Sequence, residues 1–431
     1  MATHVCGFGS SDITPSDPIP MSGFAIRTEP SIGVQDRLAA RAATFSDGSS
    51  TAAIVALELI GVDQALDSAI RRRVAEDSGL ASDAVVVAAT HTHAGPAILG
   101  DAALGAVDAD FRETVIAQAA HAVAKALRDA KPATLRVAFG HEATVAHNRR
   151  DPAGPIDPRV PIVWAERGGE VVGAIVSYAC HPVTLGPANR LLSRDYPGAV
   201  LDAIHRAHPE ATTMFLTGLA GQINTGHHAH DSQRVGDGPR RTFAEAMRLG
   251  SLVAGAALAA QESGGRLLQG PVRVRRAGVA LPYDRLPEDP ARSATRWISE
   301  RDALGERDPG RRLILETWIR WADSHAGDVP DSLMTTVAAL RIGDLVLVLH
   351  PGEVFVEDGL ALQAAFPDHP VIPVGYANDA PGYIPRREAF ASGGYEVEEA
   401  YRVYGRPAPF APEAAERLHR AALDVVADVL V

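Results

Sequence analysis

Two histidines, His91 and His93, stand directly after a short apolar segment of the chain. Residues Val85–Ala89 form an apolar run of strand length, and the sequence continues Thr-His-Thr-His-Ala-Gly-Pro. Side chains two residues apart on an extended chain point to the same side, so both imidazoles are expected to face one site at a strand end. Such a pair can bind a metal ion. Two hydrogen-bonded histidines are an equally good interpretation of this segment alone.

Two further residues that could bind a metal follow other expected strands. His181 stands just beyond the expected strand 171–178, and Glu353 lies in a Pro-Gly-Glu turn after the apolar run 345–349. Taken singly, each segment also fits a capping histidine or a solvated carboxylate. The chain has only two cysteines, which excludes a disulfide framework and a cysteine-rich zinc site. A metal ion would therefore be bound by histidine, carboxylate or tyrosine side chains.

The composition favours a globular protein that acts on a small molecule. Of the 431 residues, 46% are hydrophobic and 22% are charged, which excludes a wholly disordered, collagen-like or coiled-coil chain. With 41 basic and 53 acidic residues the net charge is −12, which argues against binding to nucleic acid or to an anionic membrane. We expect a small-molecule substrate as the partner. The sequence leaves a homo-oligomer open.

The start of the chain and its hydropathy bear on its location. Residues 1–11 contain no basic segment followed by an apolar one, and no stretch reaches the roughly 18 consecutive apolar residues of a spanning helix. We therefore expect a cytoplasmic protein with no stable membrane insertion.

Apolar periodicity predicts a mixed α/β fold. We expect strands at 51–59, 84–89, 135–139, 160–164, 171–178, 213–216 and 272–281, a hairpin at 337–350, and helices at 66–75, 111–128, 199–207, 242–260 and 413–431. The predicted architecture is mixed β-sheets, preferably two packed sheets, flanked by helices with the metal site at strand ends. We expect one domain over 1–431, with a helical excursion at about 282–330, where charged residues and three of the four tryptophans gather.

A set of dispersed motifs resembles the neutral/alkaline non-lysosomal ceramidase family. Their order and spacing match from about residue 5 to about residue 400. The motifs are Gly-Phe-Gly at 7–9, Asp-Ile-Thr-Pro at 12–15, 36–41 before Asp-Gly at 47–48, Thr-His-Thr-His-Ala-Gly-Pro at 90–96, Asn-Arg at 148–149, Cys-His-Pro-Val-Thr-Leu at 180–185, Gly-Leu-Ala-Gly-Gln-Ile-Asn at 218–224, Pro-Gly-Glu at 351–353 and Gly-Tyr-Ile at 382–384.

The resemblance implies roles for individual residues. One Zn²⁺ ion would be bound by the set His91, His181, Glu353 and Tyr383. His93 and Arg149 would lie in the active site and contact the reacting group, with His93 moving a proton and Arg149 or Tyr383 stabilising an oxyanion. These expectations agree with the residues chosen from strand ends.

The chain also departs from the family pattern. The family has a Gly-Asp-x-Ser-Pro segment with a catalytic serine, whereas this chain has Gln222 and Asn224 at those positions. We also expect this protein to lack the family's C-terminal immunoglobulin-like domain and secretion signal. We therefore expect a relative that hydrolyses an amide bond of a small soluble substrate with metal-activated water. An esterase or lactonase on the same metal site and a non-catalytic ligand-binding relative are the alternatives.

Three residues are candidates for substrate binding. They are Asn224, at the former serine position, Asp195, in the segment Ser-Arg-Asp-Tyr-Pro-Gly, and Arg386, close to Tyr383. A structural turn at Asp195 and a charged surface loop at Arg386 are the alternatives. Three histidines at 227, 228 and 230 favour a solvated loop over a second metal site.

Overall fold

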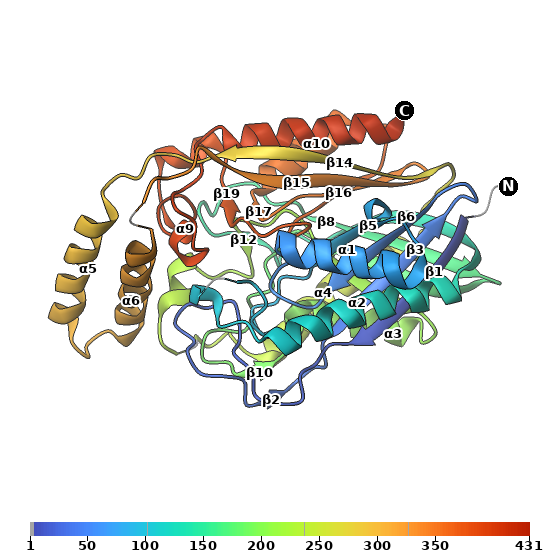
Figure 1. The fold of residues 1–431 in the computed structure, drawn as a ribbon. Coiled ribbons are helices and arrows are strands. Elements are labelled where there is room, and N and C mark those ends of the chain that lie inside the picture. The colour runs from blue at the N-terminus through green and yellow to red at the C-terminus, as the bar shows by residue number, and fades with distance from the viewer. Residues whose placement is uncertain (1–3, 101, 237, 326) are drawn as a thin grey trace.

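The computed structural model describes residues 4–100, 102–236, 238–325 and 327–431. Its strands form two large mixed sheets that share an apolar core, and helices cover their outer faces (Figure 1). This confirms the predicted fold class, with two packed sheets flanked by helices.

The larger sheet has nine strands and curls on itself. Its strands are β1 (His4–Asp12), β3 (Ala39–Ser46), β4 (Thr51–Leu57), β5 (Val85–Ala89), β6 (Lys131–His141), β8 (Arg159–Arg167), β9 (Glu170–Tyr178), β11 (Thr212–Thr217) and β13 (Arg266–Leu267). The order is β11-β9-β8-β6-β1-β3-β4-β5, with β13 beside β6. Neighbouring strands twist by roughly 20–25°, so the end strands differ greatly in direction. Strand β11 contacts β3, β4 and β5 in consequence, which brings the ends of β5 and β11 together.

The smaller sheet closes the core from the other side. It consists of β14 (Val272–Pro282), β15 (Ser332–Ile342), β16 (Leu345–Leu349) and β18 (Val371–Val374) in that order. Phe45, Ile54 and Leu216 of the larger sheet pack in one buried cluster with Leu340 and Leu347 of the smaller sheet. Burial of such side chains is the main stabilising term of the fold.

Five long helices form the outer layers. They are α1 (Gln64–Ser78), α2 (Ala109–Asp129), α3 (Asp195–Ala207), α4 (Phe243–Glu262) and α10 (Ala414–Leu430). Helices α1 and α2 cover the β1–β5 half of the larger sheet, α3 and α4 cover the other half, and α10 covers β14 and β15. Gly7 and Gly9 allow α2 to approach β1 closely, because a Cβ at these positions would lie 1.9 and 2.3 Å from backbone oxygens of α2.

Helix boundaries follow local capping. The side chains of Asp63, Asp108 and Thr242 accept hydrogen bonds from the first turns of α1, α2 and α4. By length and composition alone α4 is apolar enough to cross a membrane, and in this fold one of its faces packs against α3, β6 and β8.

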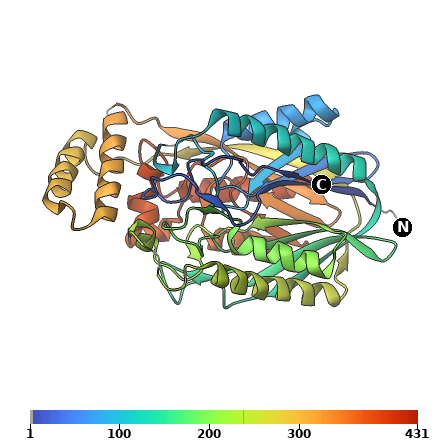
Figure 2. The ribbon, with the colours of Figure 1, turned by 90° about the horizontal axis from the view of Figure 1, so that it is seen from below.

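A helical hairpin projects from one end of the layered body (Figures 1 and 2). It consists of α5 (Pro290–Leu304) and α6 (Pro309–Ser324), each with a capping aspartate before its first proline. The remaining elements are short: β2 (Gly33–Val34), β7 (His147–Asn148), β10 (Leu191–Leu192), β12 (Ile223–Asn224), β17 (Glu353–Val354), β19 (Tyr383–Ile384), α7 (Val356–Ala365), α8 (Tyr395–Glu398), α9 (Ala400–Val403), and the 3₁₀ helices η1 (Ser82–Ala84), η2 (Ala102–Leu104), η3 (Ala229–Gln233) and η4 (Arg387–Ala391).

Candidate metal centre and active-site pocket

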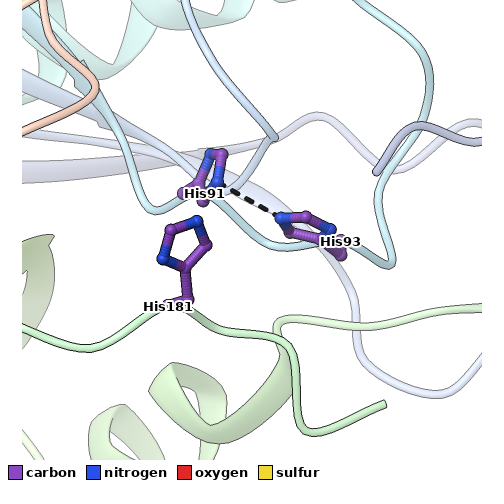
Figure 3. Close-up of side chains that lie close together, drawn as sticks. All are labelled: His91, His93 and His181. Atoms are coloured by element: carbon purple, nitrogen blue, oxygen red, sulfur yellow. Dashed lines mark hydrogen bonds between the residues drawn. The ribbon is translucent and has the colours of Figure 1, made fainter. Parts of the chain in front are cut away.

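Three histidines from two loops converge in the interior (Figure 3). His91 and His93 follow β5, and His181 follows β9. One ligand nitrogen of each lies within 4.8 Å of the other two. His91 has a φ of 66°, a conformation that costs a non-glycine residue free energy and occurs most often at functional sites.

The hydrogen bonds of the three histidines fix which nitrogen carries a proton. The Nδ1 atom of His91 lies 2.6 Å from the carbonyl of Ile60, that of His93 2.9 Å from the carbonyl of Gly23, and that of His181 2.5 Å from the carbonyl of Ala220. A carbonyl only accepts, so each Nδ1 donates and each Nε2 of a neutral ring has a free lone pair. The Nε2 atoms of His91 and His93 are nevertheless 3.2 Å apart.

A carboxylate adds a further acceptor to this group. Glu353 lies at the start of β17, with its Oε2 atom 2.6 Å from Nε2 of His181 and 3.5 Å from Nε2 of His91. Acceptors at these distances repel one another unless a proton or a cation lies between them, and protonating buried imidazoles is costly. Imidazole nitrogens oriented by backbone carbonyls and one carboxylate are a suitable donor set for Zn²⁺. The residues therefore fit a metal ion.

Burial and mutual charge set the protonation of this cluster. Burial lowers the pKa of His93 well below its usual value, and the neighbouring His91 and His181 lower it further. Burial also lowers the pKa of His181, against the effect of Glu353. For Glu353 burial raises the pKa, but the two histidines outweigh burial and hold it well below its usual range. Glu353 is thus ionised and His93 is neutral at neutral pH.

Tyr383 and Arg149 lie beside the cluster and are bonded to each other. Tyr383 pairs with Glu353 in the parallel register of β17 and β19, and its hydroxyl accepts a 3.0 Å hydrogen bond from Arg149. Burial raises the pKa of Tyr383 well above its usual value although Arg149 opposes this. The guanidinium of Arg149 also forms a buried ion pair with Glu396 at 2.8 Å. The geometry assembles His91, His93, Arg149, His181, Glu353 and Tyr383 in one place, and ligation of a metal by Tyr383 stays a prediction.

Sequence reasoning missed three residues of this centre. The hydroxyl of Tyr404 donates to Oε1 of Glu353, the ring of Tyr376 stacks on His91 with centroids 3.9 Å apart, and Glu396 binds Arg149. Tyr376 stands two residues after β18, as His91 does after β5, so its place at a strand end is a signal. Tyr404 and Glu396 lie in irregular, tyrosine-rich sequence with no comparable pattern.

A small, partly open pocket with a cavity volume of about 50 Å³ lies against the cluster. Its polar wall includes His93, Arg149, Glu353, Tyr383 and Tyr404. Ser232 and Gln233 of η3 also line it, together with the apolar side chains of Phe24, Ile60, Leu104, Val183, Ile314 and Val403.

The three predicted substrate-binding residues have other partners. The side-chain oxygen of Asn224 accepts hydrogen bonds from the N–H groups of Gly226 and His227, and its side-chain nitrogen donates one to the carbonyl of His227. The carboxylate of Asp195 accepts hydrogen bonds from the N–H groups of Thr184 and Leu185, which holds the loop after His181. Arg386 lies 3.8 Å from Asp358 on a partly exposed surface. Among the residues that the structure describes, none of the three lines the pocket, and substrate contact by them stays a prediction.

The loop that differs from the family pattern supports Glu353. Gln222 accepts from the N–H of Val356 and donates to Glu357, and the N–H of Gly221 donates to Val354. A Cβ at Gly221 would lie 2.6 Å from the carbonyl of Glu353, so this contact requires glycine. Gln222 therefore has a structural role in this chain. His230, from the same region, pairs with Glu399 at 3.3 Å, away from the histidine cluster.

Comparisons with known proteins agree with this geometry. The sequence pattern described as "Neutral/alkaline non-lysosomal ceramidase, N-terminal" matches residues 4–231, more than half of the chain. The chain belongs to this family. The resemblance seen in the sequence motifs is thereby confirmed.

The sequence identity between this chain and individual relatives is low. A curated protein of Mycobacterium tuberculosis, "Neutral ceramidase", is 27% identical over 241 residues, which is 50% of this chain and 37% of that protein. The match thus spans well under half of the relative. The crystal structure of neutral ceramidase from Pseudomonas aeruginosa has a TM-score of 0.76 at 20% identity and covers 100% of this chain and 75% of that one. A structure described as "Ceramidase complexed with C2" agrees equally well, at 19% identity. The structural likeness confirms the fold.

Proposed function

We propose that this protein is a metal-dependent hydrolase that cleaves an amide bond of a small soluble substrate. The observation that carries the proposal is the convergence of three imidazoles and Glu353 beside a pocket that Arg149 and Tyr383 also line. Membership of the ceramidase family supports the amide bond as the target, because the relatives are named for that activity.

We propose zinc as the metal, bound by His91, His181 and Glu353 with Tyr383 as a fourth candidate. Nitrogen and oxygen donors with no cysteine suit a hydrolytic zinc site. The chemistry that zinc supplies when bound is Lewis acidity, which polarises a carbonyl and lowers the pKa of water to about 7. The supporting hydrogen bonds to Ile60 and Ala220 fix the ring orientations that such binding needs.

The surrounding side chains divide the remaining work. His93 faces the pocket as a neutral base, so it accepts a proton from the attacking water and donates it to the leaving amine. Arg149, with its charge fixed, stabilises the oxyanion and orients the hydroxyl of Tyr383. Asn224 cannot act as a nucleophile, so water attacks directly and no acyl-enzyme forms.

Metal analysis combined with a substrate panel tests this proposal. The purified protein should contain about one zinc per chain, lose activity with a chelator and regain it with Zn²⁺. The panel compares N-acyl amines with esters and lactones of the same acyl groups, which separates an amidase from an esterase or lactonase. Stoichiometric zinc without turnover of any of these compounds would favour the ligand-binding alternative and contradict the proposal.

A further inference from the structure

The α5–α6 hairpin contributes to the active-site pocket from outside the layered body. Ile314 of α6 is 2% exposed and lines the pocket beside Val403 of α9. The histidines, by contrast, come from the ends of β5 and β9, on the body itself. Figures 1 and 2 show that the hairpin projects beyond one end of the sheets. A substrate group that extends from the metal centre toward the hairpin meets α6 as its outer wall.

This wall is held firmly in place. Helix α6 lies so close to η3 that a Cβ at Gly310 would be 2.3 Å from the carbonyl of Gln233. On the other side the guanidinium of Arg402 lies 4.8 Å from the ring of Trp318 and 5.1 Å from that of Trp297. The indole of Trp321 donates a 2.7 Å hydrogen bond to the carbonyl of Arg406. Contacts to η3 and to the α9 segment therefore restrain α6 on two sides.

The chemistry of the wall selects an apolar group. Ile314, Val403, Leu104 and Phe24 offer only carbon atoms from their side chains, although Ser232 and Gln233 of η3 also line the pocket and its remaining polar groups belong to the centre around Glu353. Apolar surface that leaves water for such a wall gains free energy in proportion to its area. In a hydrophobic part of a binding site, one methylene group more or less changes kcat/KM by about 10- to 200-fold.

We propose that Ile314 is a specificity-determining residue that limits the apolar group of the substrate to a short aliphatic chain. The inference rests on the proposed function and narrows its substrate class to short-chain N-acyl amides. A longer chain would have to displace α6 from η3 and from the tryptophan cluster. The length of the substrate's acyl chain, and not its fit to the hydrolytic centre, then determines which amides are hydrolysed efficiently.

A chain-length series with substitutions at position 314 tests this wall. Zinc-loaded parent, Ile314→Ala and Ile314→Phe are assayed with N-acyl anilides of two to twelve carbons. Binding of the free carboxylates of the same lengths is measured by calorimetry. We expect Ile314→Ala to raise kcat/KM about 10-fold for chains a few carbons beyond the parent's limit, and Ile314→Phe to shorten the limit. Ile319→Ala removes the same atoms from α6 at a partly buried position outside the pocket wall and should leave the limit unchanged.

The two readouts separate failure of the wall from failure of the proposed function. Equal length limits in the parent and both position-314 variants, in either readout, would overturn the role of Ile314. A parent that hydrolyses no anilide but binds carboxylates with a limit set by residue 314 would support the wall and contradict amide hydrolysis. A parent that neither hydrolyses nor binds any member of the series would overturn the inference. Because Ile314→Phe predicts a shift opposite to that of Ile314→Ala, general destabilisation cannot imitate the expected pair of results.

Discussion

The two halves of the metal centre are built differently. His91, His93, Arg149 and His181 lie within the region that the family pattern matches, and the three histidines follow strands of the large sheet. Glu353, Tyr383, Glu396 and Tyr404 lie beyond that region, on two-residue strands, a four-residue helix and a loop. The three histidines of the first half derive their positions from the large sheet, whereas the second half depends on the short β17–β19 pairing and on hydrogen bonds made across the centre.

Hydrogen bonds that cross the centre join the two halves. Arg149 of the first half contacts Tyr383 and Glu396 of the second, and His181 contacts Glu353. Short elements have little local stability of their own, so these contacts must supply it. We therefore expect substitutions in the first half to abolish metal binding, and those in the second half to weaken or misplace it.

The largest effect is expected for His181→Ala in the first half. Loss of a buried imidazole that faces Glu353 removes a ligand and leaves an uncompensated carboxylate. Zinc content should fall to near zero and kcat/KM should fall by at least about 10³-fold. Elemental analysis and kinetics check this, with the exposed His205→Ala as control. Full zinc retention in His181→Ala would contradict the expectation that the first half is essential for metal binding.

A smaller effect is expected for Tyr404→Phe in the second half. The variant keeps the ring but removes the hydroxyl that donates to Oε1 of Glu353. Losing such a supporting hydrogen bond typically lowers metal affinity by about 10- to 100-fold. Competition with a chelating dye measures the affinity, and Tyr283→Phe, which removes the same hydroxyl from a ring that stacks on Phe410, is the matched control. Unchanged affinity would show that Glu353 needs no partner from this half.

Glu396→Gln should reduce turnover while leaving zinc in place. Glu396 accepts from both Arg149 and Arg150, and these arginines hold its pKa below the usual range against the effect of burial. Without its charge, Arg149 is less well oriented toward the pocket, and we expect about a 10-fold loss of kcat with KM little changed. Steady-state kinetics with parallel zinc analysis check this. A loss of zinc instead would place Glu396 among the supports of the metal.

A further effect concerns stability, not catalysis, and the helix that follows Glu353. Burial raises the pKa of Asp358 on α7 from 3.8 to about 7, although Arg386 opposes it. The folded state therefore holds this proton more tightly than the unfolded state, so the contribution is complete below pH 4 and is lost as the pH rises through 7. Asp358→Asn should gain roughly 2 kcal/mol relative to the parent between pH 5 and pH 8. Urea unfolding of both proteins at the two pH values measures the difference, and a pH-independent difference would contradict it.

Local sequence signals account for much of the fold. Apolar runs located β4, β5, β9 and β16, and helical periodicity located α2 and α10 close to their observed bounds. Strands β1 and β3 were missed because glycine in one and alanine in the other replace the large apolar residues that mark a strand. The glycines of β1 are explained by tertiary packing, because α2 packs closely over this strand.

The residues of the site also divide into those that local sequence marks and those that only tertiary contacts explain. His91, His93 and His181 could be predicted because each stands beyond a recognisable strand, and Glu353 stands in a turn after one. Tyr404 could not, because nothing in its neighbourhood indicates that its hydroxyl reaches a residue 51 positions earlier. Long-range hydrogen bonds leave no period in a sequence, so the residues that support the centre become visible only in three dimensions.

The placement of the tryptophans makes the intrinsic fluorescence of this protein a local signal. Trp297, Trp318 and Trp321 lie in the hairpin, and Trp164 is buried in the body at 1% exposed. Emission from the hairpin indoles depends on their contact with Arg402, whereas far-ultraviolet circular dichroism averages over all helices and strands. On heating, a hairpin that separates from α9 before the sheets unfold would change the emission first and leave the dichroism nearly constant. Fluorescence therefore reports whether the hairpin is in contact with α9, and circular dichroism reports whether the chain is folded.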